Sequence, residues 1–327
     1  MKKTIKVGVI GAGRIGKLHI ENLAKNIPGV DLVGIADSNL TKELIDWAKS
    51  LGIENIYSDA YELINNPAIE AIVICSSTNT HVDFMIACAK AGKHVFLEKP
   101  IDININKAIV GIKEVEQADI KVQLGFVRRF DSVYKDIFDE INSKKYGKPE
   151  VIRIISNDPY PPSLEYTKVC GGLFMDMSIH DFDMARFLSG SEVKSVVAFG
   201  DAIINPELKE IGDIDTAKTT LTMENGVICV IENCRKSDNG YDLKVEVKCE
   251  NGELFSRIIG KEILNEHEPF FVSRFKEAFL LEMISFIDVI QNNNQPKISL
   301  KDGLAAMNIA KAAKQSLEEG CVITLNR

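Results

Sequence analysis

Short apolar runs and longer stretches of helical periodicity alternate through the first 125 residues. The apolar runs span 5–10, 31–36, 71–75, 94–97 and 121–125. Between them, apolar residues recur every three or four positions at 13–25, 41–51, 59–65, 80–91 and 104–117. Continuous Val/Ile runs are typical of strands that are buried on both faces. With helices between such strands, the pattern predicts right-handed βαβ units and an α/β Rossmann fold with a doubly wound parallel sheet.

The pattern changes after a predicted linking helix at 131–143. Beyond it, apolar and polar residues alternate with a period of two at 151–157, 193–204, 216–223, 226–234 and 241–249. This alternation is typical of an antiparallel sheet with one face on a core. Helical patterns are expected to pack on one side of that sheet, at 174–189, 273–292 and 302–319, and a short final strand is expected at 322–325. The sequence therefore predicts two domains, 1–124 and 125–327, the second an α+β domain with a large open, mostly antiparallel sheet.

Composition narrows the class of protein. Of the 327 residues, 45% are hydrophobic and 26% are charged, which is ordinary for a globular chain. The formal net charge is −8 and no run of Lys and Arg exceeds two residues, so nucleic acid is not an expected partner. No apolar run approaches the ~18 residues that a membrane helix needs. The seven cysteines include no Cys-x-x-Cys, so we expect reduced cysteines, a cytoplasmic location and no membrane partner.

A glycine-rich turn connects the first predicted strand to the first predicted helix. Its sequence is Gly11-Ala12-Gly13-Arg14-Ile15-Gly16. Gly11 permits the tight turn, Gly13 lets a pyrophosphate approach the backbone, and Gly16 lets the helix pack closely on the strand. The N–H groups at the start of the helix attract the anion. Asp37 ends the second strand, where a carboxylate accepts hydrogen bonds from the hydroxyls of a ribose.

Asp37 also bears on the choice of cofactor. Its carboxylate would repel a 2′-phosphate and no Arg follows at 38–40, so NAD is favoured over NADP. Two other interpretations stay open. The glycines can simply make a compact turn, with Asp37 starting the next helix, or the chain can be a methyltransferase, a class that also uses a glycine loop and a ribose-binding acid. Methyltransferases usually lack a second substrate domain of this type, so we prefer the dinucleotide interpretation.

Two later segments carry groups suited to the oxidation of an alcohol. Glu98-Lys99-Pro100 follows a strand, at the sheet edge where ligands bind, and Pro100 keeps Lys99 out of the helical conformation. Asp176 and His180 are four residues apart on a predicted helix, and an imidazole supported by a carboxylate can take a proton from an alcohol. Each has a structural alternative, namely a solvated lysine, a helix N-cap and an interior histidine. The five histidines have no paired-ligand spacing, so no metal is predicted.

Together these motifs resemble the Gfo/Idh/MocA family of NAD(P)-dependent oxidoreductases and, within it, the inositol dehydrogenases. The resemblance covers essentially the whole chain. It rests on Gly-x-Gly-x-x-Gly at 11–16, Glu-Lys-Pro at 98–100, Gly-Gly-x3-Asp-x3-His at 171–180, Gly-Tyr-Asp at 240–242 and the segment 125–131 after the last Rossmann strand. The joint occurrence of these motifs is specific for the family and less specific for the substrate.

The resemblance implies a role for each matching residue. His180 would be the general base on the alcohol, Asp176 would orient it, and Lys99 would hydrogen-bond the reacting oxygen. Hydride would pass to the nicotinamide of NAD. The loop 76–81 would line the nicotinamide ribose, with a helix N-cap at Thr78 or Asn79 as the alternative. The implied cofactor-binding residues are Gly11, Ala12, Gly13, Arg14, Ile15, Gly16, Asp37, Ser76, Ser77, Thr78, Asn79, His81, Glu98 and Lys99.

The resemblance also implies an uncharged cyclic polyol as substrate, which suits a chain without a basic funnel. The candidate substrate contacts are Lys99, Arg128, Asn157, Asp158, Asp176, His180, Asp183 and Tyr241. The implied activity is the oxidation of a secondary hydroxyl to a ketone, first of all at C2 of myo-inositol. Two departures from the family pattern, Ser-Asn-Asp-Pro at 156–159 and Met-Ser at 177–178, keep scyllo-inositol or an aldose as alternatives.

A non-catalytic regulator that senses NAD or a sugar is the alternative from another class. A sensor needs the pocket and not the base, so the joint presence of Lys99, Asp176 and His180 favours an enzyme.

Family members commonly associate through the exposed face of the second-domain sheet. The resemblance therefore implies a homotetramer, with a dimer as the alternative.

Overall fold

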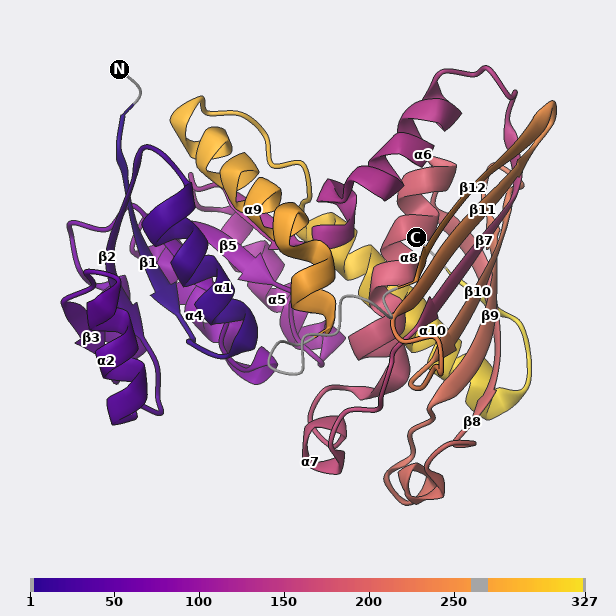
Figure 1. Ribbon diagram of the computed structural model, residues 1–327, viewed down its shortest axis with the longest axis horizontal. Helices are drawn as coiled ribbons and strands as arrows, with labels where there is room; N and C mark the ends of the chain where they lie inside the picture. Colours follow the sequence, from indigo (N-terminus) through magenta and orange to yellow (C-terminus); the bar gives the residue numbers. More distant parts are fainter. Residues whose placement is uncertain (1–2, 260–269, 326–327) are drawn as a thin grey trace. The chain divides into compact units, whose positions relative to one another are not determined.

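The computed structural model describes residues 3–259 and 270–325. They form two compact units (Figure 1). Unit 1 comprises Met1–Val127 and Lys276–Leu304, and unit 2 comprises Arg128–Phe275 and Ala305–Arg327. The predicted division after residue 124 lies close to the first boundary. It differs in one respect, because the sequence assigns everything after 124 to the second domain and the chain returns to unit 1 at Lys276.

Unit 1 is built on a parallel sheet, as the continuous apolar runs predict. Its six strands, counted over the described residues, are β1 (Ile5–Ile10), β2 (Val30–Ala36), β3 (Asn55–Tyr57), β4 (Ala71–Ile74), β5 (His94–Glu98) and β6 (Val122–Gly125). They lie in the order β3-β2-β1-β4-β5-β6 and every neighbouring pair is parallel. The strand order reverses between β1 and β4, which is where ligands bind in such sheets. The predicted doubly wound Rossmann sheet is confirmed.

Helices pack against this sheet. They are α1 (Arg14–Glu21) with the π-helical turn η1 (Asn22–Asn26), α2 (Lys42–Ser50), α3 (Ala60–Ile64), the 3₁₀ turn η2 (Thr78–Thr80) with α4 (His81–Lys90), α5 (Ile105–Glu116) and most of α9 (Phe270–Gln291). Side chains cap several of them, as at α2, where Thr41 Oγ1 accepts the Leu44 N–H at 3.2 Å. The predicted helices therefore form within a few residues of their expected ends.

The packing of α9 corrects one expectation. The sequence predicts a helix at 273–292 and expects it on the second sheet. Its residues Met283, Phe286 and Ile287 are instead buried in the core of unit 1, together with Val7 and Val9 of β1. Apolar periodicity shows which face of a helix is buried, but it does not show which sheet covers that face.

Unit 2 contains a mixed, mostly antiparallel sheet. Over the described residues its seven strands are β7 (Pro149–Asn157), β8 (Val193–Asp201), β9 (Thr216–Met223), β10 (Ile228–Cys234), β11 (Asp242–Cys249), β12 (Gly252–Ile259) and β13 (Ile323–Thr324). Their order is β12-β11-β7-β10-β9-β8-β13, and β7 and β10 are parallel. The sequence predicts this class of sheet but does not predict β12. The parallel pair is important for the site, because β7 and β10 end at the same edge.

The long helices of unit 2 lie on one face of its sheet, and shorter helical segments lie in its connections (Figure 1). They are the 3₁₀ turn η3 (Val127–Phe130), α6 (Ser132–Asn142), α7 (Leu164–Thr167), the π-helical segment η4 (Phe174–Ser178), α8 (Ile179–Ser189), the 3₁₀ turn η5 (Pro206–Ile211) and α10 (Leu300–Glu319), whose first turn belongs to unit 1. Ile152, Ile154, Cys229 and Ile231 of β7 and β10 are buried on the covered face. No helix in the described part of the chain combines the length and the apolar character needed to cross a membrane.

Candidate functional site

The carboxyl ends of four adjacent strands in unit 1 carry the predicted cofactor-binding residues. β2, β1, β4 and β5 are consecutive in the sheet. They are followed, respectively, by Asp37, the turn 11–16, the loop 76–81 and Lys99, and Glu98 is the last residue of β5. Parallel strands end at one edge, so the fold gathers these segments beside the switch point between β1 and β4.

The glycine turn is required by the backbone around it. Gly11 has φ +91°, and a Cβ there would lie 2.6 Å from the carbonyl group of Cys75. A Cβ at Gly16 would lie 1.9 Å from the carbonyl oxygen of Gly11, so α1 can approach β1 only with glycine at this position. A Cβ at Gly13, the N-cap of α1, would have no described atom within 4 Å. The turn is therefore closed at Gly11 and Gly16 and open at Gly13, where a pyrophosphate is expected.

Asp37 joins the glycine turn to the end of β2. Its Oδ2 accepts the N–H of Ala12 at 2.6 Å and its Oδ1 accepts the N–H of Asn39 at 2.8 Å. Each carboxylate oxygen has a second lone pair. Asp37 is half-buried, so both oxygens retain acceptor capacity for the hydroxyls of a ribose while the backbone fixes their position.

The loop after β4 is tied to the loop after β5 through His81. This ring is buried, with Nδ1 2.8 Å from the carbonyl oxygen of Pro100 and Nε2 3.0 Å from that of Ser76. Burial lowers the pKa of His81, although the two carbonyl contacts oppose this effect. The His81 side chain therefore supports the loop backbone and is not displayed at its surface.

The N-caps near this loop differ from the sequence alternative. Ser77 precedes the 3₁₀ turn and Thr80 precedes α4, and neither makes a side-chain cap hydrogen bond. The alternative in which Thr78 or Asn79 is the helix N-cap is therefore wrong. Ser77 and Asn79 are exposed and Ser76 and Thr78 are half-exposed, so four polar side chains line this part of the edge.

Lys99 lies directly after β5 and is half-buried. The preceding residue, Glu98, bonds to two partners. Its Oε1 lies 3.0 Å from Nε2 of His19 on α1, and its Oε2 accepts the backbone N–H of Lys99 at 3.3 Å. The acid of the Glu-Lys-Pro motif is thus bonded within the protein.

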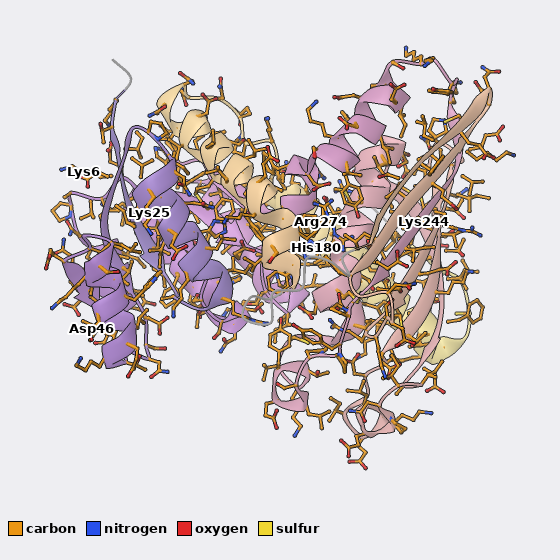
Figure 2. All side chains as sticks on the ribbon, in the orientation of Figure 1. Lys6, Lys25, Asp46, His180, Lys244 and Arg274 are labelled. Carbon is orange, nitrogen blue, oxygen red and sulfur yellow. The ribbon has the colours of Figure 1, made fainter. Side chains whose placement is uncertain are left out.

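In unit 2, Asp176 and His180 occupy two consecutive helical segments. Asp176 lies in the π-helical segment η4, and His180 is the second residue of α8 (Figure 2). The sequence predicts one regular helix over 174–189, and the structure differs by this wider turn at Asp176. Single π-helical turns within helices occur frequently at functional sites.

A buried polar network fixes the junction of η4 and α8. Asp181 accepts Arg128 and, at 2.6 Å, the hydroxyl of Ser156 on one oxygen, and Asn233 Nδ2 at 2.8 Å on the other. Asn233 also accepts the hydroxyl of Ser178, the last residue of η4, at 2.6 Å. All five residues are buried, so hydrogen bonds from Ser156 of β7, Asn233 of β10 and Arg128 of η3 fix the junction of η4 and α8.

Tyr166 and Arg235 both donate to the carboxylate of Asp176. Tyr166 Oη donates to Oδ1 at 2.9 Å, and Arg235 Nη2 donates to Oδ2 at 2.8 Å. Arg235 is buried and also lies 3.4 Å from Asp158 through Nη1. One guanidinium therefore serves two carboxylates. Burial raises the pKa of Asp158 to about 6 and the charge of Asp176 adds to this effect, while Arg235 opposes it.

The remaining candidate substrate contacts differ in burial and in bonding. Arg128 is buried in the network with Asp181. Asp183 is fully buried in a two-armed ion pair with Arg129, at 2.8 and 2.6 Å. Tyr241 is buried beside the ring of Phe275, and burial raises the pKa of its hydroxyl. Asn157 ends β7 and is half-exposed. Arg128 and Asp183 thus bond within unit 2, whereas Asn157 and Asp158 lie at the end of β7.

Sequence reasoning missed Arg235 and Tyr166. Arg235 directly follows β10, and Asp158 directly follows β7, so the parallel pairing of these strands brings them to one edge. A polar residue after each of two strands is a signal, but only when the strands are known to be parallel. Tyr166 lies in α7, a single short helix within a segment that has no periodicity. The sequence carries no comparable signal for it.

Comparison with known proteins identifies related chains. Residues 5–126 match the model of an oxidoreductase family with an NAD-binding Rossmann fold, and residues 134–255 match the GFO/IDH/MocA C-terminal domain. A myo-inositol 2-dehydrogenase of Thermotoga maritima is 41% identical over 96% of this chain and 97% of its own. A scyllo-inositol 2-dehydrogenase (NAD(+)) of Bacillus subtilis is 33% identical, over 100% and 98%. The structure of Lactobacillus casei scyllo-inositol dehydrogenase with NAD(H) and scyllo-inositol has a TM-score of 0.88 at 32% identity, over 98% and 99%.

Proposed function

The chain belongs to the GFO/IDH/MocA family of oxidoreductases, and from this premise we propose that it is an NAD-dependent dehydrogenase of cyclic polyols. It oxidises a secondary hydroxyl to a ketone, with C2 of myo-inositol as the preferred position. One observation carries the choice of substrate: the 41% identity to a myo-inositol 2-dehydrogenase extends over 96% of the chain. The family motifs with Lys99, Asp176 and His180 all lie within that span.

The residues of unit 1 fit the cofactor. The open side of the turn at Gly13 would admit the pyrophosphate to the start of α1. Asp37, fixed by Ala12 and Asn39, would accept the hydroxyls of the adenosine ribose. Ser76 and Thr78 would lie along the nicotinamide ribose. NAD, when bound, supplies the carbon that receives the hydride.

The residues of the chain would then handle the proton and the charge. His180 takes the proton of the hydroxyl that is oxidised. Asp176 stabilises the imidazolium that results, and it remains an acceptor because Tyr166 and Arg235 donate to its two oxygens. The ammonium group of Lys99 hydrogen-bonds the substrate oxygen while negative charge develops on it. Asn157 and Asp158 would bond the other hydroxyls of the ring.

The direct test is the formation of NADH by the purified protein. NAD and NADP are supplied separately against myo-inositol, scyllo-inositol and glucose. We expect the highest kcat/KM with NAD and myo-inositol. Binding of NAD without turnover of any cyclic polyol would instead support the NAD-sensing or sugar-sensing regulator. A preference for NADP would contradict the role of Asp37.

A second test concerns the base. His180→Ala should lower kcat by about 10²- to 10⁴-fold, because a positioned general base contributes that much. The affinity for NAD, measured by calorimetry, should stay near that of the wild type. If the variant retained wild-type kcat, His180 would not be the base.

The isomer of inositol is the finer question. The scyllo-inositol relative is 33% identical over the whole chain, which makes scyllo-inositol the second candidate. The ratio of kcat/KM for the two inositols decides between them. An aldose is the third candidate, and a kcat/KM for glucose above that for both inositols would select it.

We also propose a homotetramer, with a dimer as the alternative. The outer face of the unit 2 sheet exposes Phe199, Ile228 and Phe255, which supports association through this face.

We propose a cytoplasmic location as well. The seven cysteines are free thiols, which supports it, because disulfides are rare in the reducing cytosol.

A further inference from the structure

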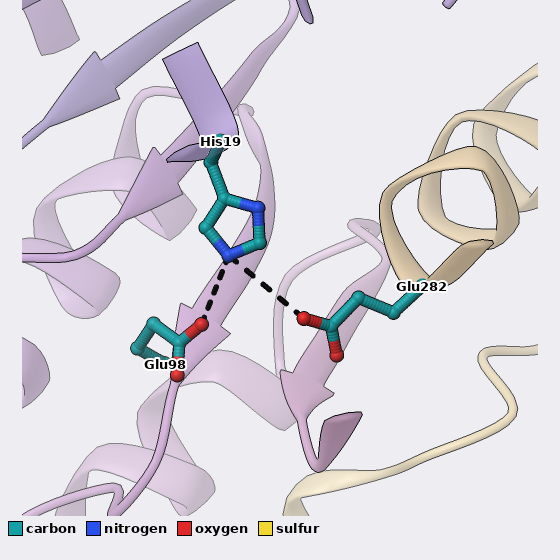
Figure 3. Close-up of side chains that lie close together, drawn as sticks. All are labelled: His19, Glu98 and Glu282. Carbon is teal, nitrogen blue, oxygen red and sulfur yellow. Dashed lines mark hydrogen bonds and ion pairs between the residues drawn. The ribbon is translucent and has the colours of Figure 1, made fainter. Parts of the chain in front are cut away.

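Three ionisable side chains meet in unit 1, and one of them is Glu98, the residue that precedes Lys99. They are His19 on α1, Glu98 at the end of β5 and Glu282 on α9 (Figure 3). Nε2 of His19 lies 3.0 Å from Oε1 of Glu98 and 3.8 Å from Oε1 of Glu282. His19 and Glu282 are fully buried. The proposed chemistry uses neither His19 nor Glu282, so the burial of these two ionisable groups needs a reason.

Glu98 links this cluster to Lys99. Its Oε1 is at hydrogen-bond distance from the imidazole, and its Oε2 accepts the backbone N–H of Lys99 at 3.3 Å. One carboxylate therefore bonds α1 on one side and the Lys99 peptide on the other. A displacement of Glu98 would displace the peptide from which the Lys99 side chain extends.

The surroundings of His19 are apolar. The rings of Phe96 and Phe279 pack edge-on against the imidazole, with centroids 5.2 and 5.7 Å away. Among the described residues, neither carboxylate oxygen of Glu282 has a hydrogen-bond partner. An ionised carboxylate is strongly destabilised in such a place. Burial, and the negative charge of Glu98, raise the pKa of Glu282 well above its usual range.

Nδ1 of His19 has no hydrogen-bond partner among the described residues, so we assign the imidazole proton to Nε2, where it faces both acids. If Glu282 were ionised, its carboxylate would compete with Glu98 for this proton. The two negative charges would also repel each other. If Glu282 holds its own proton, the imidazole N–H remains with Glu98, at the shorter of the two distances. We propose that His19 is a positioning residue for Lys99, acting through Glu98, and that Glu282 is kept as the neutral acid so that this hydrogen bond persists. The inference rests on the proposed function in so far as Lys99 contacts the reacting oxygen.

A divalent cation is the other occupant that this donor set suggests. One imidazole and two carboxylates whose ligand atoms lie within 4.8 Å of one another resemble a metal-binding group. We favour the proton, because 3.0 Å between Nε2 and Oε1 is a normal nitrogen-to-oxygen distance for a hydrogen bond, and the unpartnered Nδ1 leaves Nε2 as the nitrogen that donates. Elemental analysis of the purified protein separates the two.

The experiment compares substitutions at His19 with the same substitution at a matched histidine. His19→Leu removes the donor. His19→Gln places an amide N–H near the position of Nε2. His94→Leu is the control, because His94 lies at the opposite end of β5 and accepts the backbone N–H of Lys121 through Nδ1. Glu282→Gln gives a permanently neutral isostere of the acid. Thermal unfolding establishes that each variant is folded.

We expect His19→Leu to lower kcat by about 10- to 100-fold, since a small displacement of a reacting group has that effect. The KM for NAD should change by less than about threefold, His19→Gln should recover much of kcat, and His94→Leu should resemble the wild type. Glu282→Gln should keep kcat within about twofold of the wild type. The positioning role is wrong if His19→Leu turns over like His94→Leu. The neutral acid is wrong if Glu282→Gln loses as much as His19→Leu, or if the wild type holds one equivalent of metal that Glu282→Gln lacks.

A readout without turnover separates this inference from the proposed function. Trace labelling with acetic anhydride, followed by peptide mass spectrometry, gives the relative acetylation rate of Lys99. This rate should change at least threefold in His19→Leu and remain unchanged in His94→Leu. A wild type that oxidises no polyol would refute the proposed function and leave this test intact. An unchanged Lys99 rate in His19→Leu would refute the positioning role in either case.

Discussion

Arg235 is the residue on which the acidic part of unit 2 depends. Its guanidinium lies between Asp176, at 2.8 Å, and Asp158, at 3.4 Å, and all three side chains are largely buried. Removing the cation leaves two carboxylates facing each other in a poorly solvated place. Such a loss destabilises a protein far more than the loss of an exposed pair.

Arg235→Leu should therefore lower both stability and turnover. We expect the free energy of unfolding to fall by about 3 to 5 kcal/mol and kcat to fall by at least about tenfold, because Asp176 loses the hydrogen bond from Arg235. Urea unfolding and NADH formation measure the two effects. Lys42→Leu is the control, because Lys42 pairs with Asp46 on the exposed side of α2 in unit 1 and should change stability by less than about 1 kcal/mol. Equal losses in the two variants would contradict the bridging role.

Asp158 predicts a pH dependence of stability. Burial raises its pKa to about 6 from an ordinary value of 3.8, so its carboxyl binds a proton more tightly in the folded chain. The stability that this proton contributes is complete below the unfolded pKa and is lost as pH rises through the folded one. In Asp158→Asn this loss does not occur. Relative to the wild type, the variant should gain up to about 3 kcal/mol between about pH 4 and about pH 7.

The measurement is the difference between the two urea unfolding free energies at each pH. Other titrating groups are common to both chains and cancel in this difference. A difference that stays constant over the range would show that Asp158 titrates near its ordinary value.

At the scale of elements, we expect two glycines of the turn 11–16 to have different roles, Gly16 in folding and Gly13 in binding the cofactor. Gly16→Ala puts a Cβ 1.9 Å from the carbonyl oxygen of Gly11, so we expect a loss of stability of at least about 2 kcal/mol. Gly13→Ala meets no described atom within 4 Å and has an ordinary negative φ, so stability should be preserved. If the pyrophosphate approaches at Gly13, that variant should nevertheless bind NAD at least about tenfold more weakly. Thermal unfolding and calorimetry separate the two effects, and a Gly13→Ala variant with wild-type affinity would refute the binding site.

Elements with strong local signals were predictable, and elements defined by distant partners were not. β1 at 5–10 and β9 at 216–223 have the predicted bounds, because uninterrupted or strictly alternating apolar runs fix a strand locally. The parallel pairing of β7 with β10 depends on contacts between segments about 75 residues apart. The π-helical turn at Asp176 depends on Asn233 of β10, which accepts the hydroxyl of Ser178 at the end of the turn and donates to Asp181 in α8. Periodicity contains no information of this kind.

The residues of the candidate site also fall into two groups, those that sequence motifs identify and those that they do not. The motifs identify Gly11, Asp37 and Lys99, because their chemistry follows from residue type and position after a strand. The motifs do not identify the supporting residues His19 and Glu282, which lie near Glu98. A buried histidine on an apolar helix face, such as His19, has the pattern of an ordinary core residue, and Glu282 lies about 180 residues from Glu98 along the chain. Only the folded chain shows that they meet.

At the scale of the whole molecule, the outer face of the unit 2 sheet bears on the number of subunits. Phe255 on β12 is 78% exposed and Phe199 on β8 is 66% exposed. The same face carries paired charges, among them Lys218 with Glu232 at 3.0 Å and Arg153 with Glu246 at 3.2 Å. Exposed aromatic side chains are enriched on surfaces that bury against another chain, and the charges here are already paired within the chain.

Phe255→Asp should therefore weaken self-association. A carboxylate in the middle of an apolar contact is desolvated without a partner, and two such groups meet when identical faces associate. Light scattering after size exclusion should show a smaller mass for the variant at low micromolar concentration. Val110→Asp is the matched control, because Val110 on α5 of unit 1 is 56% exposed and receives the same type of charge. A mass that falls equally in both variants, or in neither, would place the subunit contact elsewhere. Retention of NADH formation by a monomeric Phe255→Asp species would show that a single chain contains all the groups that the reaction requires.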